Sequence, residues 1–164
     1  MNTKLLCKFR LLTVLLLFSN SVIFSQITFN WSFQSHNAAT NPTQTLTVNG
    51  ITASYTSGHT LVSGVDGYGG NPAVFAQNAS TSSVTVSFNT AVDITSLEAF
   101  EFNNADNWTF TPTGGSNSAK SVAIAKMQSN THTPARTIVN LNWTGVTSFT
   151  ISGASGGSNY PIDN

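Results

Sequence analysis

The sequence predicts an all-β fold of antiparallel strands, arranged as a β-sandwich or barrel. Residues 27–33 alternate between apolar and polar side chains, which is the two-residue period of a strand with one buried face. Further along the chain, clusters of turn-forming residues recur about every 8–12 positions, the spacing typical of sandwiches and barrels. No segment holds apolar residues at three- and four-residue spacing long enough to form a stable helix.

Residues 1–25 have the pattern of a secretory signal peptide. A basic stretch at 4–10 precedes an apolar run over 11–18, and the small residue Ser25 suits a signal peptidase. The apolar run is shorter than the roughly 18 residues that a membrane-spanning helix needs. We therefore expect cleavage after Ser25, which leaves a single domain over 26–164 that is secreted or held at the cell surface, with no membrane span.

Cleavage changes the charge and the cysteine content. The expected mature chain holds Lys120, Lys126 and Arg136 against six carboxylates, a net charge of −3. Because binding to nucleic acid relies on clustered Lys and Arg, we expect no nucleic-acid partner. The one cysteine, Cys7, lies in the signal peptide. The mature domain must then depend on its core or on bound ions, not on disulfides.

The most specific local pattern is an Asn-Gly pair at 49–50 between two alternating segments. Asn-Gly favours the two-residue type I′ turn of a β-hairpin. Such a turn places Val48 opposite Ile51. Two positions further from the turn, Leu46 opposes Ala53. These apolar residues share one face, and the intervening Thr and Ser residues point to the other.

The rest of the chain is predicted to be loops and strands. Residues 57–72 form a glycine-rich loop in this prediction. Further strands are expected at 73–77, 84–88, 97–102, 108–111, 121–126, 137–141 and 146–152. Residues 160–164 are typical of the opening of another strand that stops early, which suggests the hypothesis of a truncated gene product.

Two stretches of the chain resemble a known kind of module. Residues 140–151, followed by 160–164, are similar to the end of jelly-roll-like modules in large secreted proteins of the Bacteroidota, and the Ser-Gln junction at 25–26 is similar too. The resemblance implies a jelly-roll-like β-sandwich that is associated with type IX secretion and serves adhesion or carbohydrate contact. Its motifs are structural, so it assigns no site residue.

Sugar binding by stacking requires exposed aromatic rings beside hydrogen-bonding groups. Tyr68 in the glycine-rich loop is the first candidate. Trp108 is the second, because Asp106 and Asn107 adjoin it at a strand edge, where one end of its ring is expected to meet solvent. Core packing is the alternative for all three tryptophans, since each alternates with other apolar residues: Trp31, Trp108 and Trp143.

Two loops offer oxygen ligands for calcium, a hard cation that prefers carboxylate, amide and carbonyl oxygens. One loop contains Asp66 and Asn71, and the other contains Asn103 and Asp106. The alternative interpretation is that these side chains serve turn geometry, since Asn and Asp tolerate left-handed backbone and bond to nearby N–H groups. No other cofactor is expected.

The sequence argues against an enzyme. Residues 153–157 match the G-x-S-x-G pattern of serine hydrolases, but no helix can follow and no downstream acid and histidine complete a triad. Glu98 and Glu101 are expected on opposite faces of a strand, which makes them a poor glycosidase pair. The histidines lack the spacing of a zinc site, and they are His36, His59 and His132.

The expected function is that of a secreted, non-enzymatic module for adhesion or for contact with a polysaccharide or cell-surface glycan. A structural spacer without a ligand and a small secreted hydrolase are the alternatives. The outward Thr and Ser residues at 43–47 and 52–56 raise a further idea, a flat threonine array that orders water as ice-binding surfaces do. Threonine is also simply a good strand former, which is the plainer explanation.

Overall fold

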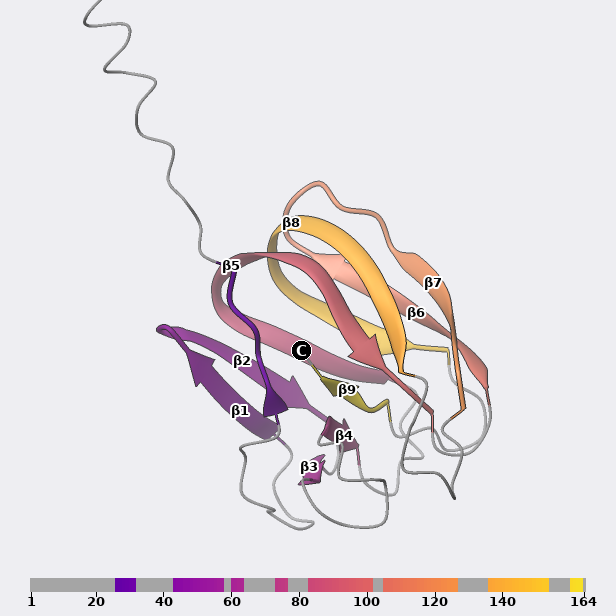
Figure 1. Ribbon diagram of the computed structural model, residues 1–164. Helices are drawn as coiled ribbons and strands as arrows, with labels where there is room; N and C mark the ends of the chain where they lie inside the picture. Colours follow the sequence, from indigo (N-terminus) through magenta and orange to yellow (C-terminus); the bar gives the residue numbers. More distant parts are fainter. Residues whose placement is uncertain are drawn as a thin grey trace, which may run out of the picture.

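The computed structural model describes residues 26–31, 43–57, 60–63, 73–76, 83–101, 105–126, 136–153 and 160–163. This part of the chain contains nine β-strands and no α-helix (Figure 1). The strands are β1 (Thr43–Val48), β2 (Ile51–Thr56), β3 (Thr60–Ser63), β4 (Ala73–Ala76), β5 (Ser83–Ala99), β6 (Asp106–Thr113), β7 (Lys120–Ile124), β8 (Thr137–Ser152) and β9 (Ile162–Asp163). The prediction of an all-β, antiparallel fold is confirmed. Over these ranges no helix has the length and apolar character to cross a bilayer.

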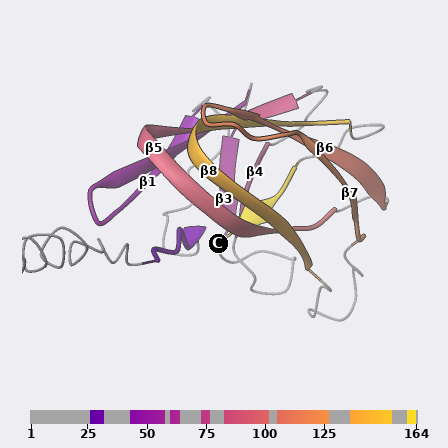
Figure 2. The same ribbon diagram turned by 90° about the horizontal axis from the view of Figure 1, so that it is seen from above.

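The longest strands, β5 and β8, pair antiparallel from Ser83 opposite Ser152 to Ala99 opposite Thr137. Both strands curve through a bend on the way, as Figure 2 shows. The first arm of the sheet contains β1, β2, the first half of β5, the second half of β8, β6 and β7. The second arm contains β3, β4, β9 and the remaining halves of β5 and β8.

Extra residues on β8 produce part of this bend. Between the pairs Val92–Val146 and Ile94–Trp143, β5 advances two residues while β8 advances three. The same offset recurs between Ile94–Trp143 and Ser96–Asn140. An extra residue in one strand is a β-bulge, which bends the strand and increases its twist. Asn142 and Gly145 of β8 accordingly have positive φ angles of 50° and 64°.

The separate strands predicted at 84–88 and 97–102 are joined as β5, and those predicted at 137–141 and 146–152 are joined as β8. The polar and glycine residues between them, which are of types common in turns, lie at bulges inside continuous strands. The predicted loop over 57–72 was also wrong in part, because it contains β3.

The strand predicted over 27–33 is not found in its described part, residues 26–31. The alternation that suggested it is nevertheless real. Ile27 and Phe29 are half-buried and Trp31 is buried, while the residues between them are exposed. This segment therefore packs one side against the sheet without being one of its named strands.

The hairpin prediction is confirmed in register and turn type. Val48 pairs with Ile51, and Leu46 pairs with Ala53. The turn residues Asn49 and Gly50 have φ angles of 51° and 80°, as a type I′ turn requires.

The strand expected near the end of the printed sequence is β9. Ile162 pairs with Val74 of β4 on one side and with Ala99 of β5 on the other. The strands thus form one continuous hydrogen-bonded sheet. Its division into the two sheets of a jelly-roll sandwich stays a prediction.

The core lies between the two arms. The ring centroids of Trp108, from the first arm, and Tyr160, just before β9, are 5.1 Å apart. The Tyr55 hydroxyl on β2 donates a 3.0 Å hydrogen bond to the Tyr160 carbonyl oxygen. Trp31 and Trp143 join the same buried cluster, so the core interpretation of all three tryptophans is confirmed.

We predict that Gly115→Ala destabilises the fold by about 2 kcal/mol or more. Gly115 has a φ of 61°, and a β-carbon there would overlap the carbonyl oxygen of Thr144 on β8. Gly50→Ala is the matched control, since Gly50 has a φ of 80° with open space around it. Gly50→Ala should lower the free energy of unfolding by about 1 kcal/mol, because it adds backbone strain alone. Chemical denaturation of both variants measures the difference, and equal losses would contradict the overlap argument.

Candidate functional site

A groove lies at the bend of the sheet, between residues 26–31 and β5. Its volume is about 690 Å³, within the range of sites that bind small ligands. All residues of β5 from 90 to 97 line it, together with residues from β2, β8 and β9. The groove is therefore a product of the bend, with β5 as its longest wall.

Aromatic rings form part of the apolar lining of the groove, beside several aliphatic side chains. Phe29 and Phe88 both line it, and their ring centroids are 6.1 Å apart. Phe88 also lies 6.3 Å from Phe149, which in turn contacts Trp143 at 6.0 Å. Phe149 and Trp143 are buried, whereas Phe29 and Phe88 are only half-buried. The outer two rings thus keep surface that a ligand can cover.

Polar groups line the same groove. Thr90 and Thr95 are exposed, and Ser96 is half-buried. One carboxylate oxygen of Asp93 accepts a 2.8 Å hydrogen bond from the backbone N–H of Gly145, at the bulge of β8. The bulge therefore fixes the direction of the one lining carboxylate that lies on the bend.

Backbone groups of β5 add to this polar lining. On the side away from β8, β2 pairs with β5 only as far as Phe88, and β9 begins to pair at Glu98. Between these two points, no strand of the described chain pairs with that side of β5. The half-buried Val92 and Ile94 lie along this open edge. No strand of the described chain therefore takes up the N–H and C=O groups along this edge.

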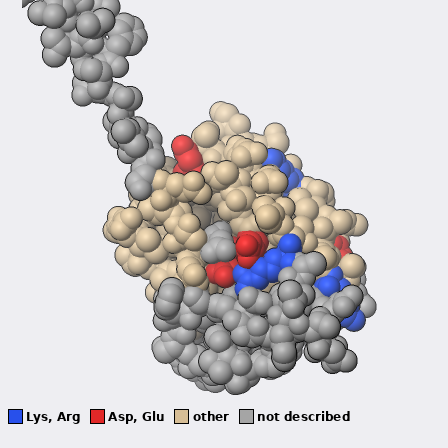
Figure 3. Space-filling model, in the orientation of Figure 1, with Lys and Arg blue, Asp and Glu red and all other residues tan. Residues whose placement is uncertain are grey.

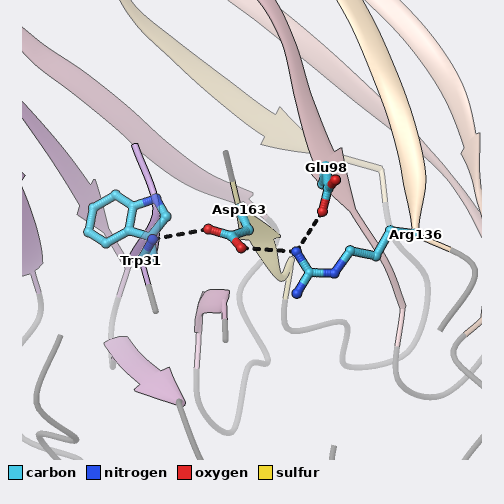
Figure 4. Close-up of polar contacts among 4 residues, drawn as sticks. All are labelled: Trp31, Glu98, Arg136 and Asp163. Atoms are coloured by element: carbon cyan, nitrogen blue, oxygen red, sulfur yellow. Dashed lines mark hydrogen bonds and ion pairs between the residues drawn. The ribbon is translucent and has the colours of Figure 1, made fainter. Parts of the chain in front are cut away.

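An ionic cluster adjoins the groove at Asp163. Arg136 Nη1 lies 2.6 Å from Glu98 Oε2 and 2.9 Å from Asp163 Oδ2. The other oxygen of Asp163 accepts a 3.0 Å hydrogen bond from the backbone N–H of Trp31 (Figure 4). The cluster ties residues 26–31 to β5, β9 and the start of β8. Figure 3 shows acidic and basic side chains next to one another near the middle of this face.

The ionic cluster is sheltered from solvent. The exposed fractions of the side chains are 13% for Arg136, 5% for Asp163 and 30% for Glu98. The Arg136 guanidinium also lies 5.5 Å from the ring centroid of Phe100, a cation–π distance. Because these carboxylates already hold the cation, the geometry favours a structural clamp over proton-transfer chemistry.

The structure corrects the ligand site expected around Trp108. Trp108 has an exposed fraction of 0%, so no end of its ring meets solvent and it offers no surface for a sugar. Asp106 is half-buried and Asn107 is exposed, but neither lines the groove. The other predicted site residues lie outside the described residues, and they are Tyr68, Asp66, Asn71 and Asn103.

The calcium prediction stays a prediction. Asp106 is the member of the two proposed ligand sets that falls within the described ranges. Across those ranges, no three His, Cys, Asp or Glu side chains group closely enough to hold a metal ion.

Sequence reasoning missed the groove and Arg136. The alternation of Val92, Ile94 and the polar residues between them was a usable signal for a strand through 90–97. Asn89 and Asp93 interrupt this signal, because Asn and Asp are typical of turns. The ion pairs of Arg136 with Glu98 and Asp163 had no local signal, since these residues lie 38 and 27 positions away.

Comparisons of the chain with protein-family models, with curated proteins and with solved structures found no match. The interpretation of the groove therefore depends on its own residues and geometry.

We predict that Arg136→Met lowers the free energy of unfolding by about 3 kcal/mol, because it leaves two sheltered carboxylates close together without a counter-ion. Adding Asp163→Asn should recover part of this loss, since the amide oxygen still accepts from Trp31. Lys120→Met is the control. Its ammonium donates to the Asn140 carbonyl oxygen at the surface, so the change should stay within about 0.5 kcal/mol. Urea denaturation measures the free energy of unfolding of each variant. A decrease for Arg136→Met no larger than that for Lys120→Met would contradict the structural clamp.

Proposed function

We propose that the protein is an exported, non-enzymatic module for adhesion or carbohydrate contact, and that a neutral glycan segment lies in the groove. The observation that carries this proposal is the composition of the groove. Half-buried rings at Phe29 and Phe88 line it together with the hydroxyl-bearing residues Thr90, Thr95 and Ser96.

This combination suits a sugar. A pyranose ring has an apolar face that covers an aromatic ring, while its hydroxyls need donors and acceptors around the edge. The open edge of β5 between Phe88 and Glu98 supplies both kinds of backbone group, and Asp93 supplies a charged acceptor. A ligand with hydroxyls on all sides can use this mixture better than a purely apolar molecule.

The charges favour a neutral ligand. The described residues that line the groove include Asp93 and Asp163 but no Lys or Arg. The nearby cation of Arg136 is already held by two carboxylates. An acidic polysaccharide or a nucleic acid would meet carboxylates without a compensating cation.

Two features of the sequence support export and adhesion. The signal-peptide pattern of residues 1–25 directs the chain outside the cell, where glycans are abundant. The resemblance to jelly-roll-like modules of secreted Bacteroidota proteins implies the same role. Calcium at the predicted loops would serve such a module by ordering them, which is why binding should be measured with and without it.

We predict that a glycan array detects binding to a neutral polysaccharide, and that the double variant Thr95→Val, Ser96→Ala weakens it. Two lost hydrogen bonds of about 1 kcal/mol each correspond to roughly tenfold or more in affinity. Thr144→Val on β8 removes an exposed hydroxyl outside the groove and should leave the affinity unchanged.

Isothermal titration calorimetry of the purified protein measures these affinities. The absence of binding to any polysaccharide, with or without calcium, would favour the spacer alternative. Release of reducing sugar during the titration would favour the hydrolase alternative. Equal affinities for the double variant and the wild type would place the ligand outside the groove.

A further inference from the structure

The outward side of the first arm carries only hydroxyl side chains over three cross-strand rows. The first row joins five strands and is threonine throughout, and its members are Thr43, Thr56, Thr85, Thr150 and Thr111. The second row contains Thr45, Ser54, Ser87, Ser148 and Thr113. The third row contains Ser83, Ser152, Thr109 and Ser121. We call these residues the hydroxyl face.

The hydroxyl face is open to solvent and uncharged. Each of its residues is half-buried or exposed, and none is buried. The residues between them on the same strands point inward, and Val84, Val86, Phe149 and Ile151 are examples that pack in the core. The packed core therefore lies directly behind the hydroxyl face, and the outer surface of the face holds no ionic group and no aromatic ring.

The rows and strands impose a regular grid. Neighbouring strands are about 4.8 Å apart, and alternate residues along a strand are about 6.7 Å apart. Cross-strand hydroxyl pairs fix orientations at both edges of the face, with oxygens 3.1 Å apart for Thr43 and Thr56 and 3.0 Å apart for Thr109 and Ser121. Each hydroxyl has one donor and two acceptor positions, so these pairs leave capacity for water.

We propose that the hydroxyl face binds the surface of ice. Oxygen atoms at an ice surface recur in two directions at distances of the same size as this grid. Threonine offers a hydroxyl that joins the water lattice and a methyl group that leaves neighbouring water bound only to other water. Charged side chains would instead impose their own hydration shells, and the rows contain none.

The twist of the sheet determines the kind of ice activity. Adjacent strands rotate by about 20° relative to one another, so the grid matches a flat lattice over only a few strands at a time. A small matched patch holds an ice surface loosely. The expected activity is therefore slowed recrystallisation of ice, and not a large depression of the freezing point. This inference is independent of the glycan proposal, because no residue of the three rows lines the groove.

The test compares recrystallisation of ice in solutions of the purified protein and its variants. Thr85→Tyr and Thr150→Tyr place bulky rings in the middle of the all-threonine row, and we expect loss of inhibition. Tyrosine is a good strand former, so the fold should persist, and thermal melting checks this. Ile138→Tyr is the control, because Ile138 is exposed on β8 outside both the rows and the groove.

A gain-of-function variant makes the test sharper. Ser87→Thr with Ser148→Thr adds methyl groups to the second row, and stronger inhibition is expected. Wild-type protein that slows recrystallisation no more than an inert protein at the same concentration would overturn the proposal. Tyrosine variants that inhibit as well as the wild type would also overturn it. If these variants instead lose binding to a polysaccharide, the face is a glycan surface and the ice proposal is wrong.

Discussion

The pairing of β5 with β8 is the interaction on which the rest of the structure depends. It is the one ladder that runs through both arms. Three further strands pair directly with it: β2 and β9 pair with β5, and β6 pairs with β8. Because the pair bends, the arms come together around Trp108 and Tyr160, and the core can form between them. The same bend separates β2 from β9 along β5 and so opens the groove. A straight pair would give neither feature.

The bend is held by specific hydrogen bonds. Positive φ at Asn142 costs of order 1 kcal/mol in strain. Against this, Asn117 donates to the Thr144 carbonyl oxygen at 2.8 Å and accepts from its N–H at 3.0 Å. Asp93 accepts from the N–H of Gly145. Each such bond contributes about 1 kcal/mol, which is enough to offset the strain and to fix the bulge. Asp93, which helps to fix the bulge, is thus also one of the residues that line the groove.

Features that depend on residues close together in the sequence could be predicted, and features that depend on residues far apart could not. The register of the hairpin was predictable, because the turn at 49–50 alone determines it. The length of β5 was not, since Asn89 and Asp93 suit a turn equally well and only pairing with β8 decides between the two structures. The hydroxyl face shows the same limit. The threonines of β1 and β2 suggested an array locally, but its extension to Thr85 and Thr150 requires the register of strands distant in sequence. The ionic cluster of Arg136 is equally non-local.

The uncharged character of the hydroxyl face is not explained by folding alone. A sheet with one buried face needs polar residues on the other, and Lys, Glu or Gln would satisfy that need as well as threonine does. The described chain does have charges, but it places them elsewhere. Asp93 lies at the bend, and Glu98, Arg136 and Asp163 form the ionic cluster that adjoins the groove. Strand propensity accounts for some of the threonines, yet serine is no strong strand former and still occupies the remaining positions of the rows. The common property of all these positions is the short hydroxyl side chain. A surface that must keep a regular, uncharged layer of hydrogen-bonding groups requires that property, whereas a merely solvated surface does not.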